Sequence, residues 1–516
     1  MSPILKPGTS WPELYDRCAG IAPEAFHHDR LLNHVGGEWQ RIGTPTEATS
    51  PVDGSTIAGP PRLDAAQAEN AVAAAVEQHR KWAAVPLEER KARTKAALAE
   101  LHAHRDLLAL LLVWEIGKPW RLATADVDRC IEGVEWYVEE IDPMLHGRTP
   151  LHGPVSNIAS WNYPMSVLMH AMLVQALAGN AVIAKAPTDG GVSCLTLATA
   201  LVVRHGLPLT LVSGGGRDLS PVLVGSPDIG CLSFVGGRGA GNEIVTGLDT
   251  GLDATKRHIL EQEGLNCWGV WEFGDWDALR PQIRQSFDYA KQRCTAYPRY
   301  VVQRSLFDSF LEVYLEAVRE VTFGHPLAVP SPDDDLPRLD FGPLITDAKA
   351  KELADVVDEA IAKGGVPLYR GTLDAGRFLP DQQTSAYFAP VAILAPPPSS
   401  PLHHAEPFGP VDTIVLVDTE AELLAAMNAS NGALVASLSC DDEGVVRRLA
   451  GEVNAFKFGH GKARSRGDRE EVFGGRGASW RGAFVGGALL VHAVTEGPPG
   501  ERLYGNFPSY SLYPPT

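Results

Sequence analysis

Apolar and polar positions follow two different patterns along the chain. From Asp64 to about Val138, apolar residues recur at helical spacing in an alanine-rich background, which predicts a series of helices. After Val155, short apolar runs alternate with helical stretches. The predicted strands are Val155–Trp161, Asn180–Lys185, Leu209–Val212, Ile229–Phe234 and His258–Leu260, and the helices between them include Met165–Leu177 and Ser193–His205. Strands that alternate with helices indicate a parallel, doubly wound sheet.

A second series of the same kind starts near Trp268. Its predicted elements are a helix at Pro281–Gln292, a strand at Arg299–Gln303, helices at Ser305–Val321 and Thr346–Lys363, and strands at Val391–Leu394 and Thr413–Val417. The sequence therefore predicts an α/β fold of two tandem doubly wound domains with a cleft between them.

The predicted domain boundaries follow from these two series. We expect a first domain at residues 1–262, which includes an N-terminal segment wrapped over the surface, and a second domain at 263–455. We expect residues 456–516 to form a C-terminal return segment and an oligomerisation tail. The aromatic, proline-rich stretch from Glu501 onwards is either disordered or packed against another surface.

Composition narrows the possible partners. The 516 residues are enough for two or three well-buried cores, and the net charge of −18 disfavours binding to nucleic acid or anionic membranes. The apolar run Leu107–Val113 is too short to cross a bilayer, and residues 1–29 do not resemble a signal peptide. The seven cysteines are scattered and form no CxxC pair, which favours neither disulfides nor a metal site. We therefore expect a cytoplasmic protein without a bound metal.

One cysteine, Cys294, stands in a polar stretch between Lys291 and Ala296. A buried structural role is the commoner one for a single cysteine, and we accept it for the other six. A nucleophilic role requires an electropositive or dipolar environment that favours the thiolate. The basic neighbours Lys291 and Arg293 are consistent with such an environment.

Three other segments supply groups that a thiol nucleophile needs. Asn162 follows an apolar strand and can donate a hydrogen bond to a developing oxyanion. Glu261 ends a strand beside a glycine turn and can act as a general base. Glu406 and Phe408 lie in a tight turn bounded by prolines. Taken singly, these segments also read as a helix cap, a solvated acid and a rigid loop.

Nine segments, in this order, resemble the aldehyde dehydrogenase superfamily. They are Leu32–Trp39, Glu115–Pro119, Ser160–Pro164, Gly179–Lys185, Leu232–Gly237, Leu260–Gly264, Lys291–Ala296, Glu406–Val411 and Phe473–Gly475. The resemblance spans Leu32 to Val494 and implies NAD(P)-dependent oxidation of an aldehyde to a carboxylic acid. It implies that Cys294 attacks the aldehyde carbon and that Asn162 and the Cys294 backbone N–H hold the oxyanion. Glu261 would then activate the water that hydrolyses the thioester.

The resemblance also implies a cofactor site. Its members would be Lys185 and Thr188 at the adenosine ribose, Gly236 and Gly237 at the pyrophosphate, Ser160 and Trp161 along the cleft, Glu406 at the nicotinamide ribose and Phe408 against the nicotinamide. NAD-preferring members usually carry an acid three residues after the lysine, where this chain has Thr188. A hydroxyl and the Lys185 ammonium can both bind a 2′-phosphate, so NADP is favoured. If the loop is shifted by one residue, Asp189 supplies an acid and NAD is favoured instead.

Several positions depart from the superfamily pattern. The run from Glu261 to Leu265 replaces Glu-Leu-Gly-Gly-Lys, so the base is either Glu261 or Glu263, and the alignment favours Glu261. Lys291 replaces a usual glycine. The segment Ile141–Pro154 looks too short for the hairpin that usually pairs subunits. We therefore expect a homo-oligomer and favour a dimer over a tetramer.

Two alternative functions remain open. A coenzyme A-acylating semialdehyde dehydrogenase would pass the thioester to coenzyme A, but that branch tends to lack the base, so Glu261 argues against it. A non-catalytic binding or assembly protein on a decayed scaffold would explain the altered turns, but Cys294 and Asn162 are both present. The aldehyde itself is not identified. Arg293 beside the nucleophile either favours an anionic substrate or is simply solvated or salt-bridged.

Overall fold

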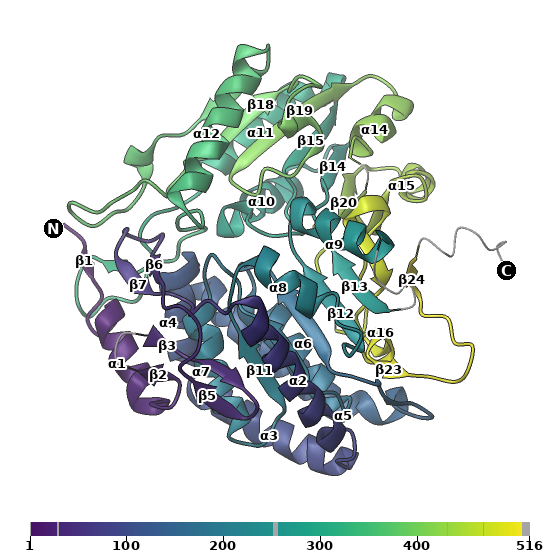
Figure 1. Cartoon of the computed structure of the whole chain (residues 1–516). Helices are drawn as coiled ribbons and strands as arrows, with labels where there is room; N and C mark the ends of the chain where they lie inside the picture. Colours follow the sequence, from purple (N-terminus) through teal and green to yellow (C-terminus); the bar gives the residue numbers. More distant parts are fainter. Residues whose placement is uncertain (1, 28–29, 251–255, 431, 468, 508–516) are drawn as a thin grey trace.

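Two sheets organise the molecule. The computed structural model describes residues 2–27, 30–250, 256–430, 432–467 and 469–507. Within these ranges a nine-stranded sheet lies below a seven-stranded sheet in the view of Figure 1. The nine-stranded sheet comes mainly from the first half of the chain and the seven-stranded sheet from the second.

The nine-stranded sheet has a parallel centre and antiparallel edges. Its order is β24-β22-β13-β12-β9-β10-β11-β4-β5. The parallel strands are β9 (Val155–Ala159), β10 (Val182–Lys185), β11 (Leu209–Val212), β12 (Cys231–Val235) and β13 (Arg257–Glu261). The edge strands are β4 (Asn33–Val35), β5 (Glu38–Gln40), β22 (Trp480–Ala483) and β24 (Gly505–Asn506). All five strands predicted for the first domain are present, with ends shifted by at most two residues.

Both faces of this sheet are buried, as the apolar runs of its strands require. Successive side chains alternate between faces, so Val182 and Ala184 join one core cluster while Ile183 joins another. The helices that cover the sheet and each other are α2 (Ala65–Trp82), α3 (Leu87–Ala103), α4 (Arg105–Ile116), α5 (Trp120–Met144), α6 (His170–Leu177), α7 (Val192–Val203) and α8 (Gly216–Leu223). The predicted helical region after Asp64 thus consists of four consecutive helices.

The seven-stranded sheet is parallel except at one edge. Its strands, in spatial order, are β17 (Val366–Arg370), β18 (Val391–Leu394), β19 (Val411–Val417), β15 (Arg299–Gln303), β14 (Cys267–Val270), β20 (Ala433–Ser439) and β21 (Ala455–His460). Only β17 runs antiparallel to its neighbour. The helices of this half include α10 (Trp276–Ser286), α11 (Phe307–Arg319), α12 (Asp347–Ala362), α14 (Glu420–Met427) and α15 (Glu443–Ala450). The predicted α/β class with two doubly wound units is confirmed, while the residue boundaries of the domains stay a prediction.

Two segments differ from the sequence-based expectation. The first fifty residues contain the helix α1 (Trp11–Ile21), which buries Trp11, Leu14 and Cys18. The helix expected at Pro281–Gln292 instead starts at Trp276, where the Asp275 side chain accepts a hydrogen bond from Ala278 N at 3.2 Å. It ends at Ser286, because the residues that follow soon turn into the left-handed region.

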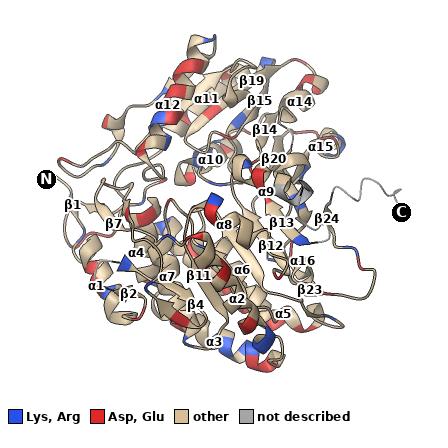
Figure 2. Cartoon of the chain, in the orientation of Figure 1, with Lys and Arg blue, Asp and Glu red and all other residues tan. Residues whose placement is uncertain are grey.

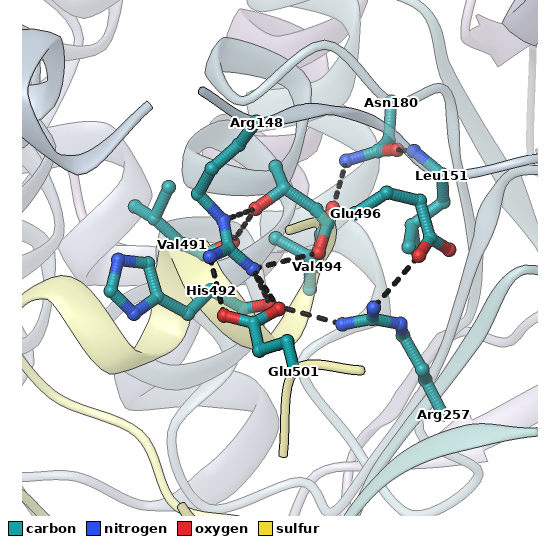
Figure 3. A network of polar contacts seen from close by, with 10 residues as sticks. Arg148, Leu151, Asn180, Arg257, Val491, His492, Val494, Glu496 and Glu501 are labelled. Carbon is teal, nitrogen blue, oxygen red and sulfur yellow. Dashed lines mark hydrogen bonds and ion pairs between the residues drawn. The ribbon is translucent and has the colours of Figure 1, made fainter. Parts of the chain in front are cut away.

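The C-terminal part of the chain returns to the first sheet. After β21, strand β22 pairs with β13, and β23 (Thr495–Glu496) pairs with β8 (Thr149–Pro150). Figure 3 shows how Arg148 fastens this return. Its guanidinium donates to Glu501 Oε1 at 2.6 Å and to Thr495 Oγ1 at 2.7 Å. Between the end of α5 and Val155 the only strand is the short β8. The oligomeric state stays a prediction.

Charges of both signs lie along outer helices. Figure 2 shows acidic and basic residues together on α3 and on α12. Among the described helices, none combines the length and apolar content needed to cross a bilayer.

The Arg148 contacts lead to a stability prediction. Arg148→Gln should lower the free energy of unfolding by about 1–3 kcal/mol at neutral pH, because a guanidinium whose side chain is 5% exposed loses charged hydrogen bonds to Glu501. Arg148 lowers the pKa of Glu501 below its usual 4.5, so this stabilisation is complete above that pH and is lost as the pH falls through the lowered pKa. Urea denaturation of both proteins at pH 7 and pH 3.5 measures it. Arg304→Gln, which removes the exposed ion pair of Arg304 with Asp418, should leave the denaturation midpoint unchanged. An equal loss of stability in Arg148→Gln at both pH values would contradict the prediction.

Candidate active site

The carboxyl ends of four parallel strands lie at one edge of the first sheet. Lys185, the last residue of β10, pairs with Ile158 of β9. Ala159, the last residue of β9, pairs with Val235 of β12, which in turn pairs with Glu261 of β13. In open α/β sheets, ligands bind just beyond such strand ends. The register therefore brings the predicted residues Lys185, Ser160, Gly236 and Glu261 to one edge.

The Cys294 thiol lies beside the Glu261 carboxylate. Its side chain is partly exposed, but its surroundings are dense. This burial raises the pKa of Cys294 well above its usual 9.0, the charge and hydrogen bonding of Glu261 raise it further, and Glu406 adds to the effect. Arg466 acts in the opposite direction. The thiol, two carboxylates and one guanidinium thus form a single electrostatic cluster.

Glu261 is buried and paired. It is 1% exposed, and Arg466 Nη1 lies 3.3 Å from its Oε2. Glu263, the other candidate base, points elsewhere: its Oε2 accepts a hydrogen bond from Arg238 N at 3.3 Å in the first turn of α9 (Arg238–Thr250). Of the two acids, the structure places Glu261 next to the thiol.

Asn162 contacts the loop that carries the thiol, which runs from Lys291 to Tyr297 and is called the thiol loop. Strand β9 ends at Ala159, and the chain enters a π-helical turn, Pro164–Met169, directly after Tyr163. Asn162 is 5% exposed, its Nδ2 donates to Gln292 O at 3.1 Å, and its Oδ1 accepts from Ser160 Oγ at 2.5 Å. Gln292 stands two residues before Cys294, and the amide of Asn162 has a second N–H besides the one that Gln292 accepts. Ser160 therefore orients the amide.

The thiol loop follows a strained turn. Tyr289, Ala290 and Lys291 have φ values of 59°, 52° and 57°. Left-handed backbone costs roughly 1–2 kcal/mol for each non-glycine residue, so surrounding contacts must hold this turn. Gln292 supplies one of them, because its side chain accepts from Ile345 N at 3.0 Å and donates to Pro343 O at 3.2 Å.

The expected effect of the basic neighbours on the thiol is not what the structure shows. Lys291 is buried, and its Nζ lies 2.9 Å from Asp412 Oδ1. Arg293 donates from Nη2 to Ser286 O at 3.1 Å. Because burial, and after it the carboxylates of Glu261 and Glu406, outweigh Arg466, the pKa of Cys294 is raised rather than lowered in the free protein.

The predicted cofactor residues fall into two groups. Trp161 and Phe408 meet edge to face, with ring centroids 5.9 Å apart and planes at 88°. Glu406 lies beside them in the chain, and burial together with Glu263 and Glu261 raises its pKa well above the usual value. At the other group, Lys185 Nζ donates to Thr188 Oγ1 at 3.2 Å, while Gly236 and Gly237 connect β12 to α9.

The described residues hold no cluster of three or more His, Cys, Asp or Glu side chains placed to bind a metal ion.

Sequence comparison places this arrangement in a family. The profile of the aldehyde dehydrogenase family matches residues 39–496. The chain belongs to the aldehyde dehydrogenase family. The family and the enzyme class predicted from the nine motifs are thereby confirmed.

Individual aldehyde dehydrogenases are similar to this chain over most of its length. A 3,6-anhydro-alpha-L-galactose dehydrogenase of Streptomyces coelicolor is 27% identical over 497 residues, which cover 92% of this chain and 95% of the relative. An NADP-dependent glyceraldehyde-3-phosphate dehydrogenase of Bacillus halodurans, complexed with NADP, superposes with a TM-score of 0.79 at 24% identity, covering 90% of this chain and 97% of that one. A betaine aldehyde dehydrogenase of Staphylococcus aureus, in complex with NAD+, gives a TM-score of 0.79 at 21% identity, covering 94% and 96%. At these identities the two structures establish the fold.

The residues of this aldehyde dehydrogenase fit a dinucleotide, with one restriction. Exposed Gly237 precedes α9, and a Cβ on it would meet nothing closer than Glu263 Oε2 at 4.0 Å, so a ligand can approach the backbone closely. Helix N-termini bind phosphates through free N–H groups. Here the Glu263 carboxylate already accepts from Arg238 N, so a pyrophosphate at this helix end requires that carboxylate to move away.

Two contributors to this aldehyde dehydrogenase site were missed by sequence reasoning. Arg466 lies in a polar segment without a motif, and only its contact with Glu261 reveals it. Asn266 Nδ2 donates to Cys294 O and Ala296 O, both at 2.8 Å, and so holds the thiol loop. Asn266 also accepts from Leu434 N at 3.2 Å. The signal that could have indicated Asn266 is its polar side chain in an otherwise apolar strand region of the sequence.

The cluster around the thiol predicts how its reactivity depends on pH. In the free enzyme, the rate of Cys294 alkylation by iodoacetamide should still rise at pH 9, because the pKa of the thiol lies well above 9.0. Glu261→Gln removes a negative charge and releases Arg466, so the pKa should fall and the rate at pH 8 should increase severalfold. Glu263→Gln is the matched control and should keep the wild-type profile. Superimposable profiles for Glu261→Gln and wild type would rule out this account of the thiol.

Proposed function

We propose that this chain oxidises an aldehyde to a carboxylic acid, with NAD(P) as the hydride acceptor and Cys294 as the nucleophile. The observation that carries the proposal is the position of the Cys294 thiol. It lies beside Glu261 and Glu406, next to the strand ends where α/β sheets bind ligands. Bound NAD(P) supplies the two-electron acceptor for the hydride that leaves the substrate carbon.

The raised pKa of Cys294 means that its proton must be taken up when it attacks. Of the charged groups, Glu261 raises the pKa of the thiol most, and its Oε1 has no hydrogen-bond partner among the described residues, so we assign it the role of accepting that proton. The sulfur then forms a bond to the carbonyl carbon, and the carbonyl electron pair moves onto oxygen. The second N–H of the Asn162 amide is available to that oxyanion. Such a donor typically lowers the activation barrier by about 3–4 kcal/mol.

Loss of hydride from the carbon leaves a thioester on Cys294. Glu261 must first release the proton of the thiol to solvent, and the resulting carboxylate can then deprotonate a water molecule beside the thioester. Arg466 holds the Glu261 carboxylate by an ion pair of 3.3 Å, which keeps it in the buried position facing the thiol. Water attack breaks the carbon–sulfur bond and returns the thiol with the acid product.

NADP is favoured over NAD by the loop after β10. Thr188 is exposed, and Lys185 donates to its hydroxyl, so an ammonium and a hydroxyl stand together where a 2′-phosphate can be bound. Asp189 also acts electrostatically on Lys185, which keeps NAD as the alternative. The Bacillus halodurans structure with NADP and the Staphylococcus aureus structure with NAD+ support use of either dinucleotide by this fold. A homodimer in the cytoplasm and domains divided near residues 262 and 455 complete the proposal.

Cys294→Ala tests the reaction directly. Reduced-nicotinamide formation from a panel of aldehydes, followed by absorbance with NAD and with NADP, should fall at least 10³-fold, because no other group can form the thioester. Cofactor binding, measured by quenching of tryptophan fluorescence, should persist. The matched variant Cys440→Ala, which removes a buried cysteine directly after β20, should retain activity. Turnover by Cys294→Ala comparable to wild type would refute the proposal.

The fate of the thioester is measured in the same assay. Acid release should be independent of added coenzyme A if Glu261 activates water. Turnover that requires coenzyme A would show that the acyl group is transferred to coenzyme A and not to water.

Thr188→Glu should change the cofactor preference. The new carboxylate repels a 2′-phosphate and can accept hydrogen bonds from ribose hydroxyls, so the Kd for NADP should rise at least tenfold while that for NAD is kept or falls. Isothermal titration calorimetry measures both constants. Thr188→Ser should preserve the wild-type preference. If the cofactor preference changes in Asp189→Asn but not in Thr188→Glu, Asp189 sets the preference.

A further inference from the structure

The side chain of Lys291 closes the loop that carries the thiol. Lys291 stands three residues before Cys294 and Tyr297 stands three residues after it. Lys291 Nζ donates a hydrogen bond to Tyr297 O at 3.0 Å. The contact joins the two ends of the loop across its base, with Cys294 in the middle. We call this side-chain bridge the thiol-loop clasp.

The clasp is buried and charged. Lys291 and Asp412 side chains are 1% and 0% exposed, and Nζ lies 2.9 Å from Asp412 Oδ1. Nζ also donates to Ser286 Oγ at 2.6 Å, and Asp412 Oδ2 accepts from the Tyr314 hydroxyl at 2.8 Å. A buried ion pair of this kind often adds little net stability over apolar residues, so its retention is better explained by the geometry that it imposes.

The same pair connects the loop to the segment of Glu406 and Phe408. Asp412 is the second residue of β19, and it follows Phe408 by four residues along a turn bounded by Pro407 and Pro410. Strand β19 pairs with β15, which starts two residues after Tyr297. Movement of the thiol loop relative to the Glu406–Phe408 turn would therefore have to break the ion pair.

The backbone of Lys291 gives a second reason for a dedicated role. Its φ of 57° is a conformation that glycine adopts without strain. Lysine accepts that strain and adds the clasp. The strain of the turn and the buried charge pair thus point to the same function.

We propose that Lys291 and Asp412 are positioning residues that hold the Cys294 thiol against Glu261 and set its place relative to the Glu406–Phe408 turn. This inference rests on the proposed function of Cys294 as the nucleophile. Neither residue touches the reacting atoms. Their effect is on where the sulfur lies, and small misplacements of a reacting group lower rates strongly.

The test uses the full chain carrying Lys291→Gly and Asp412→Asn together. Glycine tolerates the left-handed backbone and asparagine removes the buried charge that would otherwise be unpaired, so the double variant should fold. Two rates should then change in opposite directions. The rate constant of NADPH formation in a single turnover should fall at least tenfold, while alkylation of Cys294 by iodoacetamide at pH 8 should become at least threefold faster, because the freed thiol moves away from Glu261 into solvent. The Kd for NADPH should stay within twofold.

Controls separate positioning from general loss of stability. Arg148→Gln removes a buried guanidinium from its network, remote in sequence from the thiol, and should lower stability while leaving both rates at wild-type values. If the double variant does not fold, Asp412→Asn alone, which can keep the hydrogen bond from Tyr314, should show the same opposite changes. A folded variant with both rates within twofold of wild type would overturn the inference. If the wild-type chain oxidises no aldehyde, the proposed function fails, but the alkylation rates still decide whether the clasp holds the thiol.

Discussion

The parallel register of β10, β9, β12 and β13 is the constraint on which the rest of the structure depends. Because Ala159, Val235 and Glu261 are paired in one row, the residues that follow these strands must emerge at one edge of the sheet. A shift of one residue in β13 would turn Glu261 to the opposite face. The chemistry of the site is thus fixed first by backbone pairing and only then by the side chains.

The second sheet brings the nucleophile to that edge through a backbone conformation that is unfavourable by itself. The turn at Tyr289–Lys291 has no glycine, and its stability comes from contacts made by side chains at both ends of the thiol loop. Asn266, directly before β14, holds the loop and is itself held by Leu434 of β20, while Asn162 holds the loop from the first sheet through Gln292. The loop is therefore tied to both halves of the molecule. This is how a nucleophile on one sheet can be kept beside a base on the other.

Alternation of short apolar runs with helical stretches predicted the five parallel strands at the centre of the first sheet, because buried parallel strands leave a strong signal. In the second sheet it predicted β15, β18 and β19 but missed β14, β17, β20 and β21. It placed the end of α10 wrongly, because no glycine or proline marks the left-handed turn that follows. At the site, motif order found Cys294, Glu261 and Asn162. It did not find Arg466 or Asn266, because their partners lie far away in sequence. The electrostatic effect of Lys291 was also misjudged, since its nearest charge, Asp412, is 121 positions further along.

The pairing of β13 with β22 has a consequence for biogenesis. Glu261 lies opposite Trp480, so the edge of the strand that carries the base is completed only by residues from the far end of the chain. During synthesis on the ribosome, that edge stays uncovered until more than two hundred further residues have been added. Such long-range closure slows folding and leaves an open strand exposed to association with other chains. Newly made molecules can acquire a complete catalytic centre only after Trp480 has been added.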